Sequence, residues 1–484
     1  MAGIAQTMHG ARSRHDYQAS PATREAVYAV YYDQLRRRMA FALHHALMVS
    51  QADSTLYYQA RAYADTMDML NRRAFGNYRA LLEDLALSPA MGLWLSHLRN
   101  RKEDPVSGRQ PDENFARELM QLFSIGLVEL NSDGSVRRDA AGNPIETYTN
   151  ADVMALAKVF TGFSWAYPDS QLTEQTFRWS TPPLGSAAAD QRLDLLPMKA
   201  YPGQHSTAAK TLFAGKAWGA TIPANGNALA DVRAALDLLF NHPNVGPFVG
   251  RQLIQQLVTS NPSPAYVARV AAVFANNGKG VRGDLAAVAR AILLDVEARG
   301  TPPAGFGKLR EPVLRVAHWM RSFGARSASG DYMLAWDLDN VQQRVLNAPS
   351  VFGYFRPGYV PPNTALATNS VTAPEFQILD ESTSAVWVNL VEGMVGSGMG
   401  WTGSASDVSS DYAALVAASA GGNLAALADQ VNLLLMAGRM SPTLRQAVLD
   451  AAGGVAGSGA ATDLNRARAA VFVTLASPEY LVQP

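Results

Sequence analysis

The sequence predicts a mainly α-helical protein, a multi-helix array with a small β-hairpin excursion and long irregular insertions. Apolar residues recur at helical spacing along most of the chain, as in Leu35, Met39, Leu43 and Leu47. Short connections containing Pro, Asn and Gly separate such segments, which is typical of antiparallel neighbouring helices. Asp-Gly and Gly-Asn-Pro turns interrupt the helical pattern near residues 127–148, where we expect the hairpin.

The composition excludes several kinds of site and partner. The 484 residues include 41 Lys and Arg and 41 Asp and Glu, so the formal net charge is zero and nothing in the charge balance favours nucleic acid. There is no cysteine. Disulfides, Cys-ligated zinc, iron–sulfur clusters and covalently attached c-type haem are therefore excluded.

No targeting or membrane-spanning segment is expected. The first residues, MAGIAQTMHGARSRHDYQ, lack the apolar core of a signal peptide. No apolar run reaches the roughly 18 residues that a transmembrane helix needs. Residues 1–20 are expected to be a disordered or truncated N-terminus, so either the chain is cytoplasmic or its original start is missing.

An N-terminal helical region is expected over residues 21–165. Apolar periodicity predicts helices over Glu25–Ser50, Tyr57–Leu70, Tyr78–Leu87 and Met91–Leu98. The segment PDENFARELMQLFSIGL, Pro111–Leu127, is the next expected helix, with Asp112 as its N-cap. After the hairpin we expect another helix over Ala151–Gly162, capped by Asn150.

Local composition defines three further regions. Residues 166–226, rich in Pro, Ser, Gly and isolated aromatics, are expected to be an irregular insertion. Residues 227–324 carry successive apolar stripes with short connections and are expected to be the central helical array. Residues 325–484 are expected to be C-terminal loops and helices. Within them we expect an ordered aromatic loop at Ser350–Pro362 and a flexible Gly/Ser-rich stretch at Gly396–Ser410.

The main candidate site lies on one face of the helix expected in PDENFARELMQLFSIGL. That face carries Glu113, Asn114, Arg117, Glu118 and Gln121. Carboxylates and amides can coordinate a hard cation, and a carboxylate beside an arginine can perform acid/base chemistry. The same pattern is also typical of a solvated helix face with one intrahelical ion pair. The residues alone leave both interpretations open.

Two histidines near loop ends are further candidates. His205 lies near an expected helix start and is followed by Lys210, and His242 lies in an Asn-His-Pro-Asn turn between two core helices. Loop ends gather functional groups, so both histidines could face one cleft. A single histidine is nevertheless more often a packed or capping residue than a ligand. No HExxH, GxSxG or P-loop motif is present, and the identity of any metal stays unknown.

Three cations mark candidate anion-binding positions. Lys279 and Arg282 lie in GKGVRG, directly before an expected helix start, where backbone N–H groups favour an anion; a tight interhelical turn is the alternative. This segment fits GxGxxG, but the preceding segment is predicted helical rather than a strand, so no nicotinamide cofactor is expected. Arg310, with Lys308 and Glu311, lies at an expected helix start, where cations favour a buried ion pair or an anion.

Several segments along residues 30–484, taken together, resemble one bacterial family. They are LRRRMAFAL, ALSPAMGLWLSHLRN, DENFARELMQLFSIGL, YTNADVMALAKVFTGFSW, HSTAAKTLFAG, HPNVGPFVGRQLIQQLVTSNPSPAYVARVAAVFANNGKGVRGDL, GKLREPV, SVFGYFRPGYVPP, APEFQI and LASPEYLVQ. The family that they resemble is known only as domain of unknown function 1800. The sequence departs from its pattern at the start, where the export signal and first helices are absent, and at His44-His45, where smaller polar residues are usual.

The resemblance implies a mainly helical protein and brings no catalytic assignment. Members of the family often carry an export signal. Their genes commonly lie beside those of a sulfatase-like family, domain of unknown function 1501. The resemblance therefore implies a helper or partner role in the periplasm or outside the cell.

Two hypotheses from different classes stay open, with a cytoplasmic scaffold as a third. The first is an exported accessory or binding partner of a sulfatase-like protein, which predicts exposed aromatic surface around Phe352–Tyr359. The second is a metal-assisted or acid/base hydrolase, which predicts that side chains far apart in the sequence converge within about 10 Å of one pocket. Those side chains are Glu113, Arg117, Glu118, His205 and His242.

Overall fold

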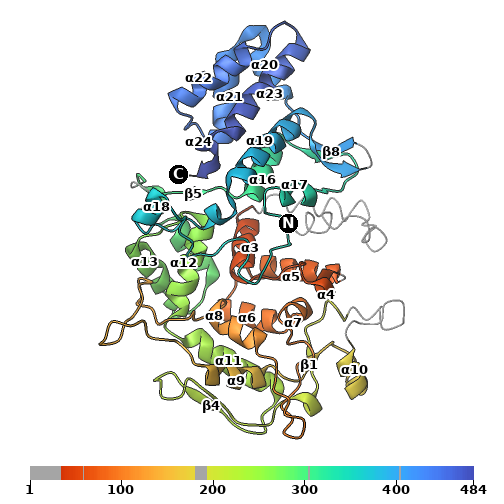
Figure 1. The fold of residues 1–484 in the computed structure, drawn as a ribbon, viewed down its shortest axis with the longest axis vertical. Helices are drawn as coiled ribbons and strands as arrows, with labels where there is room; N and C mark the ends of the chain where they lie inside the picture. The colour runs from red at the N-terminus through yellow and green to blue at the C-terminus, as the bar shows by residue number, and fades with distance from the viewer. Residues whose placement is uncertain (1–33, 58, 180–192, 303–305, 403–404, 484) are drawn as a thin grey trace. The chain divides into compact units, whose positions relative to one another are not determined.

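The computed structural model describes residues 34–57, 59–179, 193–302, 306–402 and 405–483. Within these ranges the protein is mainly helical with four small antiparallel sheets (Figure 1), which confirms the predicted fold class. Contacts divide the chain into two compact units. The first holds the described residues up to Pro302 together with Pro349–Phe352, and the second holds the rest. The expectations for residues 1–20 and for a helix start at Glu25 lie outside the described residues.

The first unit begins with largely buried helices, as the apolar periodicity predicts. They are α3 (Gln34–Ala46), α4 (Ser54–Tyr57), α5 (Ala60–Arg73), α6 (Tyr78–Ala86), α7 (Pro89–Trp94) and α8 (Asn114–Gln121). Helix α3 packs on α5 and α12, and the side chains of Met39 and Leu43 are fully buried. Pro89 starts α7 at a position where a backbone N–H is not needed.

Helix α8, which carries the candidate face, is shorter than predicted. Its N-cap position is occupied by Glu113 rather than by Asp112. The Asp112 carboxylate lies one residue further out and accepts hydrogen bonds from the Asn114 backbone N–H and from Ser96 Oγ, both at 2.9 Å. The predicted N-cap is therefore wrong by one residue, although the carboxylate still serves the helix start.

The excursion after α8 forms the predicted β-structure. Antiparallel bridges join Val128 to Glu146, Leu130 to Val136 and Arg138 to Pro144. Its two turns place Gly134 and Gly142 at φ of 78° and 87°, which glycine adopts without strain.

Helix α9 (Asn150–Val159) follows the excursion. Its N-cap is Thr149, in a capping box with Asp152, rather than the predicted Asn150.

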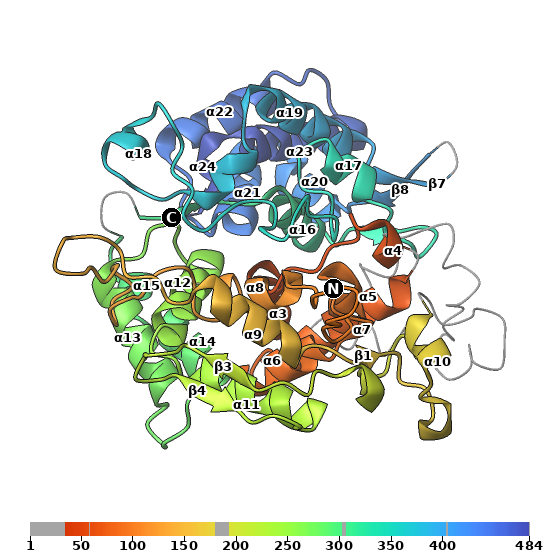
Figure 2. The ribbon, with the colours of Figure 1, turned by 60° about the horizontal axis from the view of Figure 1, so that its bottom comes forward.

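The insertion and the following helices complete the first unit. The insertion contains β1 (Phe163–Ser164), η3 (Asp169–Gln171), α10 (Glu174–Arg178), β2 (Lys199–Ala200), η5 (Pro202–Gln204), β3 (Lys210–Leu212) and β4 (Ala220–Ile222). The helices are α11 (Ala228–Asn241), α12 (Val245–Leu257), α13 (Pro264–Ala275), α14 (Leu285–Leu293) and α15 (Val296–Arg299). Strand β3 contacts α9, and β4 contacts α11 (Figure 2). These contacts bring the loops before and after β3 close to the start and end of α11.

The second unit is a helical assembly with two small sheets. It contains β5 (Lys308–Leu309), α16 (Pro312–Ser322), β6 (Arg326–Ser327), α17 (Ala335–Asp339), α18 (Ala365–Thr368), η6 (Pro374–Ile378), α19 (Glu381–Gly396), β7 (Met399–Thr402), β8 (Ala405–Ser409), α20 (Ala413–Ser419), η7 (Ala420–Gly422), α21 (Leu424–Met436), α22 (Pro442–Gly453), α23 (Ala460–Ala476), α24 (Pro478–Leu481) and β9 (Val482–Gln483). Helix α23 packs against α19, α20, α21 and α22. Helix α16, which the sequence places in the central array, packs on α21 in this unit.

Two loop predictions for the second unit have different outcomes. The stretch Gly396–Ser410, predicted to be flexible, contains β7 and β8, and β8 also pairs with β6. The aromatic loop is ordered as predicted, because Tyr354 and Phe355 are only 8% and 5% exposed. No helix in the described ranges is both long and apolar enough to cross a bilayer.

Candidate functional site

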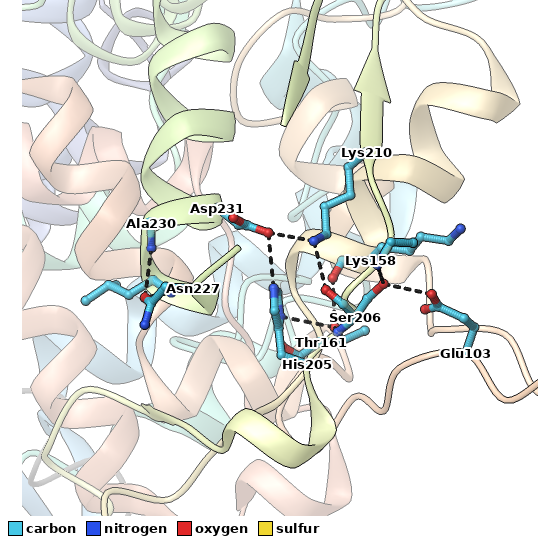
Figure 3. Close-up of polar contacts among 11 residues, drawn as sticks. Glu103, Lys158, Thr161, His205, Ser206, Lys210, Asn227, Ala230 and Asp231 are labelled. Carbon is cyan, nitrogen blue, oxygen red and sulfur yellow. Dashed lines mark hydrogen bonds and ion pairs between the residues drawn. The ribbon is translucent and has the colours of Figure 1, made fainter. Parts of the chain in front are cut away.

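A buried polar cluster joins the end of α9, the segment before β3 and the first turn of α11 (Figure 3). His205, Lys210 and Asp231 are each at most 3% exposed. Asp231 Oδ2 accepts a hydrogen bond from Lys210 Nζ at 2.5 Å and lies 3.2 Å from His205 Nε2. Lys210 Nζ also donates to the Ser206 backbone oxygen at 2.8 Å. The carboxylate thus has a cationic partner and a ring N–H within the protein interior.

Local sequence positions Asp231 at the start of α11. Asn227 caps this helix by accepting hydrogen bonds from the N–H groups of Leu229 and Ala230. A Cβ at residue 226 would lie only 2.2 Å from Asp231 Oδ1, so any side chain at Gly226 would displace this carboxylate. The first turn of a helix also favours a carboxylate through the helix dipole. Together these features hold Asp231 facing Lys210.

The His205 ring has hydrogen-bond acceptors on both sides. Nδ1 lies 2.8 Å from the Thr161 backbone oxygen, and Nε2 faces the Asp231 carboxylate. A carbonyl and a carboxylate only accept, so either ring nitrogen that carries a proton has a hydrogen-bond partner within the protein.

Ser206 contacts Glu103 and Thr161, and so connects the cluster to residues other than His205. Its Oγ donates to Glu103 Oε1 at 2.8 Å, and its backbone N–H donates to Thr161 Oγ1 at 2.8 Å. A nucleophilic serine needs a hydrogen bond from its hydroxyl to a base, which takes up the proton as the oxygen attacks. Here the imidazole does not contact the hydroxyl, so the cluster lacks the arrangement of a Ser–His–Asp triad.

The α8 face divides into an exposed part and a buried part. Glu113 and Arg117 form an intrahelical ion pair at 2.8 Å, with side chains 34% and 41% exposed. Asn114 is exposed beside them. Glu118 is different, because it is 7% exposed and its Oε2 has no hydrogen-bond partner among the described residues. Burial raises the pKa of Glu118, while the nearby Arg117 lowers it.

His242 is held in the turn between α11 and α12. It is 1% exposed, and its Nδ1 accepts a hydrogen bond from the Asn244 backbone N–H at 3.1 Å. Nε2 must therefore carry the proton of the neutral ring. Burial lowers the pKa of His242 to about 4, so the ring is neutral at pH 7.

The described contacts place the predicted catalytic residues in separate groups. Glu113 pairs with Arg117, His205 contacts Asp231, and His242 contacts Asn244. Among the described residues, no hydrogen bond or ion pair joins one of these groups to another. Nor do three or more His, Asp or Glu side chains of this part of the chain come together as metal ligands. Their convergence on one pocket stays a prediction.

Two of the predicted anion-binding cations lie in the turn before α14. The side chains of Asn276 and Asn277 accept hydrogen bonds from backbone N–H groups of this turn, including that of Lys279. The Arg282 guanidinium donates to the backbone oxygens of Phe240 and His242, at 3.0 and 2.9 Å. Arg282 thus binds the carbonyl end of α11, a favourable place for a cation.

Arg310, the third predicted cation, lies in the second unit. Its guanidinium stacks 4.5 Å from the Tyr480 ring centroid and donates to His318 Nδ1 at 3.2 Å. Nearby in sequence, Lys308 forms a buried ion pair with Glu375 at 2.9 Å. The GKLREPV segment therefore contains a buried ion pair, one of the two outcomes expected for it.

The chain matches the family described as "Protein of unknown function (DUF1800)" over residues 6–482. It therefore belongs to this family, as its sequence resemblance indicates. No curated protein and no solved structure matches the chain.

Sequence alone does not single out Asp231, the centre of the buried cluster. Its signal is an acidic residue directly before Val232 and four residues before Ala235, on the buried side of α11. Burying a charged side chain at such a position costs free energy unless a hydrogen-bonding or oppositely charged partner lies beside it. The partner, Lys210, lies 21 residues earlier, in a strand that sequence does not predict.

We predict that Asp231→Asn lowers the free energy of unfolding of the first unit by about 3–5 kcal/mol, because it leaves buried Lys210 without its carboxylate. Asp237→Asn, on the same helix, is the control. Asp237 is 61% exposed and pairs with Arg79 at the surface, so its loss costs no more than about 1 kcal/mol. Denaturant unfolding of both variants measures the difference; equal effects would contradict a structural role for Asp231.

We also predict that the first unit loses stability as the pH falls from about 6.5 to 4. Burial lowers the pKa of His44 to about 3 and those of His97 and His242 to about 4. The unfolded chain binds these protons near pH 6.5, so acid favours unfolding, by about 3 kcal/mol per histidine at pH 4. Because the pKa of Glu118 is raised in the folded protein, protonation of this carboxyl in acid adds stability and offsets part of the loss. Unfolding free energies measured against pH test this.

In the same titration, His97→Gln is expected to reduce the change in unfolding free energy between about pH 7 and 4, because one of the titrating rings is removed. Glutamine has no titratable group but keeps a donor for the Ala86 oxygen that His97 Nε2 contacts at 2.9 Å. If the free energy of unfolding of the unchanged protein stays constant from about pH 7 to 4, the folded protein does not hold these rings neutral.

Proposed function

We propose that the protein is an exported accessory or binding protein that works with a sulfatase-like partner. The genes of the family that the sequence resembles commonly lie beside those of sulfatase-like proteins, and its members often carry an export signal. A chain without cysteine suits a periplasmic or secreted location. The structural observation that carries the proposal is an exposed aromatic side chain in the second unit.

That side chain is Trp336 of α17, which is 65% exposed. The Arg344 guanidinium lies 4.9 Å from its ring centroid. Tryptophan and arginine are the residues that most often dominate the binding energy of protein interfaces. In the aromatic stretch expected to be exposed, Phe352 is 40% exposed, whereas Tyr354 and Phe355 are buried. Trp336 is more exposed than Phe352, so we propose that the partner surface includes Trp336 and Arg344.

The pairing of polar side chains, both buried and at the surface, also favours binding over catalysis. Lys210 and Asp231 pair with each other, and both nitrogens of His205 face acceptors. Glu113 and Arg117 pair at the surface. Groups that are satisfied within the chain are poorly placed to exchange protons with a substrate.

We predict that Trp336→Ala weakens capture of the neighbouring sulfatase-like protein by at least about 30-fold, the loss typical of an interface hot spot. Leu433→Ala is the matched control, since Leu433 is 66% exposed in the same unit and lacks an aromatic ring. Co-purification and a binding titration with the full chain measure the effect. If the unchanged chain fails to bind the partner, the accessory function is wrong.

One observation favours a hydrolase as the second candidate. The Glu118 carboxyl is buried, lacks a hydrogen-bond partner at Oε2, and has a raised pKa. A carboxyl whose pKa is raised keeps its proton to a higher pH than an exposed glutamate does, and a protonated carboxyl can act as a general acid. In this alternative it works with Glu113 and Arg117, and with His205 and His242, on an ester or a metal-bound substrate.

If the protein is a hydrolase of this kind, we predict that replacing Glu118 lowers its activity. Assays with p-nitrophenyl acetate, phosphate and sulfate, together with metal analysis of the purified chain, provide the measurement. A hydrolase would show turnover or bound metal that Glu118→Gln lowers at least about 100-fold, the scale of a general acid's contribution. Asp237→Asn, which breaks only a surface ion pair outside this group, is the control and should leave turnover and metal content unchanged. Absence of turnover and metal in the unchanged chain would remove this candidate.

A further inference from the structure

The loop between β3 and β4 begins with a residue in an unfavourable conformation. Phe213 has a φ of 55°, in the left-handed region that bulky side chains seldom adopt, and it is 1% exposed. Its backbone N–H donates to Asp152 Oδ1 at 2.5 Å, and its carbonyl accepts from Lys216 N–H at 3.0 Å. Strain of this kind gathers at functional sites, where the surrounding structure holds it in place.

This loop brings Trp218 against His242. The two ring centroids lie 4.7 Å apart with the rings nearly perpendicular, at 81°. The indole Nε1–H can only donate a hydrogen bond. The Asn244 N–H occupies Nδ1 of His242, so its Nε2–H is also a donor. The two rings that carry these donors, from separate elements, are therefore in contact.

Both donors are buried and unpaired. Neither Trp218 Nε1 nor His242 Nε2 has a hydrogen-bond partner among the described residues. The great majority of buried polar atoms in native proteins are paired, because an unpaired one is costly. The two N–H groups thus point to an acceptor that the described part of the chain does not supply.

The charges around the two rings favour an anionic acceptor. Lys216 Nζ lies 5.5 Å from the Trp218 ring centroid and donates to Glu129 Oε1 at 2.7 Å. Glu129 also pairs with Arg137 at 2.7 Å. At the His242 ring itself, Lys216 and Arg282 each lower the pKa and Glu129 raises it, so two cations and one carboxylate act on this ring. The Lys216 side chain is 34% exposed and can attract an anion from solution.

We propose that His242 Nε2–H and Trp218 Nε1–H bind an oxygen of a small oxyanion, with Lys216 supplying the attracting charge. Carboxylate, phosphate and sulfate groups share this chemistry. Each offers a negatively charged oxygen that accepts two hydrogen bonds. The site is independent of the partner surface at Trp336, and its existence does not depend on the proposed accessory function.

Titration of the full chain with sulfate, phosphate or acetate, at ionic strength held constant with sodium chloride, tests the site. The indole N–H signal of Trp218, identified by its loss in Trp218→Phe, is followed in ¹H–¹⁵N spectra. We expect a saturating downfield shift with at least one anion and a Kd of about 1 mM or tighter. Calorimetry should show binding weakened about tenfold in Trp218→Phe, which removes one hydrogen bond but keeps an aromatic ring.

Trp94 provides the matched control, because its Nε1 is also buried without a partner among the described residues. Its signal should not move. The proposal is overturned if no anion gives a saturating shift, as expected for an ordered water or an N–H contact to the neighbouring ring. Equal shifts at Trp94 and Trp218, or unchanged affinity in Trp218→Phe, would overturn it as well.

Discussion

The contact between Asp231 and Lys210 organises the polar interior of the first unit. Lys210 has no exposed surface, and the carboxylate oxygen 2.5 Å from its ammonium group also faces the ring of His205. These residues belong to α11, to β3 and to the segment before it, and His205 in turn contacts Thr161, just after α9. The pair therefore links three parts of the chain at one point. Loss of the carboxylate would leave unpaired groups where water cannot reach them.

A second group of contacts fixes the corner between α11 and α12. The Asn244 side-chain amide donates to the backbone oxygens of Ile125 and Val128, at 2.8 and 2.7 Å, and so ties the β-excursion to this corner. Arg282 binds the carbonyls at the end of α11. Against this well-paired background, Glu118, Trp218 and His242 each have a buried polar atom without a partner among the described residues. A missing partner alone does not mark a ligand site, since Trp94 Nε1 also lacks one among the described residues; Trp218 and His242 differ because their two rings are in contact.

Sequence predicts the helices better than it predicts the contacts between them. The apolar repeats indicate α5, α6 and α11–α14 because a buried helix face imposes a fixed spacing. The predicted caps at Asp112 and Asn150 are each wrong by one residue, since neighbouring polar residues can serve the same N–H groups. Strands β7 and β8 are not predicted because their segment is rich in Gly and Ser, and β6 is not predicted because its partner β8 lies far away in the sequence.

The same limit applies to the site. His205 and His242 are recognisable as polar residues at loop ends, but their partners Asp231 and Trp218 depend on tertiary packing. Glu118 is recognisable within its motif, whereas its burial is not, because the residues around it come from other segments. Sequence patterns thus indicate which side chains merit attention, and only the fold shows whether each is paired.

Hydrogen exchange of individual backbone amides tests the structural role of the buried cluster most directly. The Ser206 and Asp231 N–H groups donate to Thr161 Oγ1 and the Asn227 oxygen, at 2.8 and 2.9 Å. If the cluster is a fixed structural centre, both exchange as slowly as the amide of Leu236, in the buried face of α11, through unfolding of the whole unit. Exchange of Ser206 through local opening, at least about 100-fold faster than that of Leu236, would contradict this account.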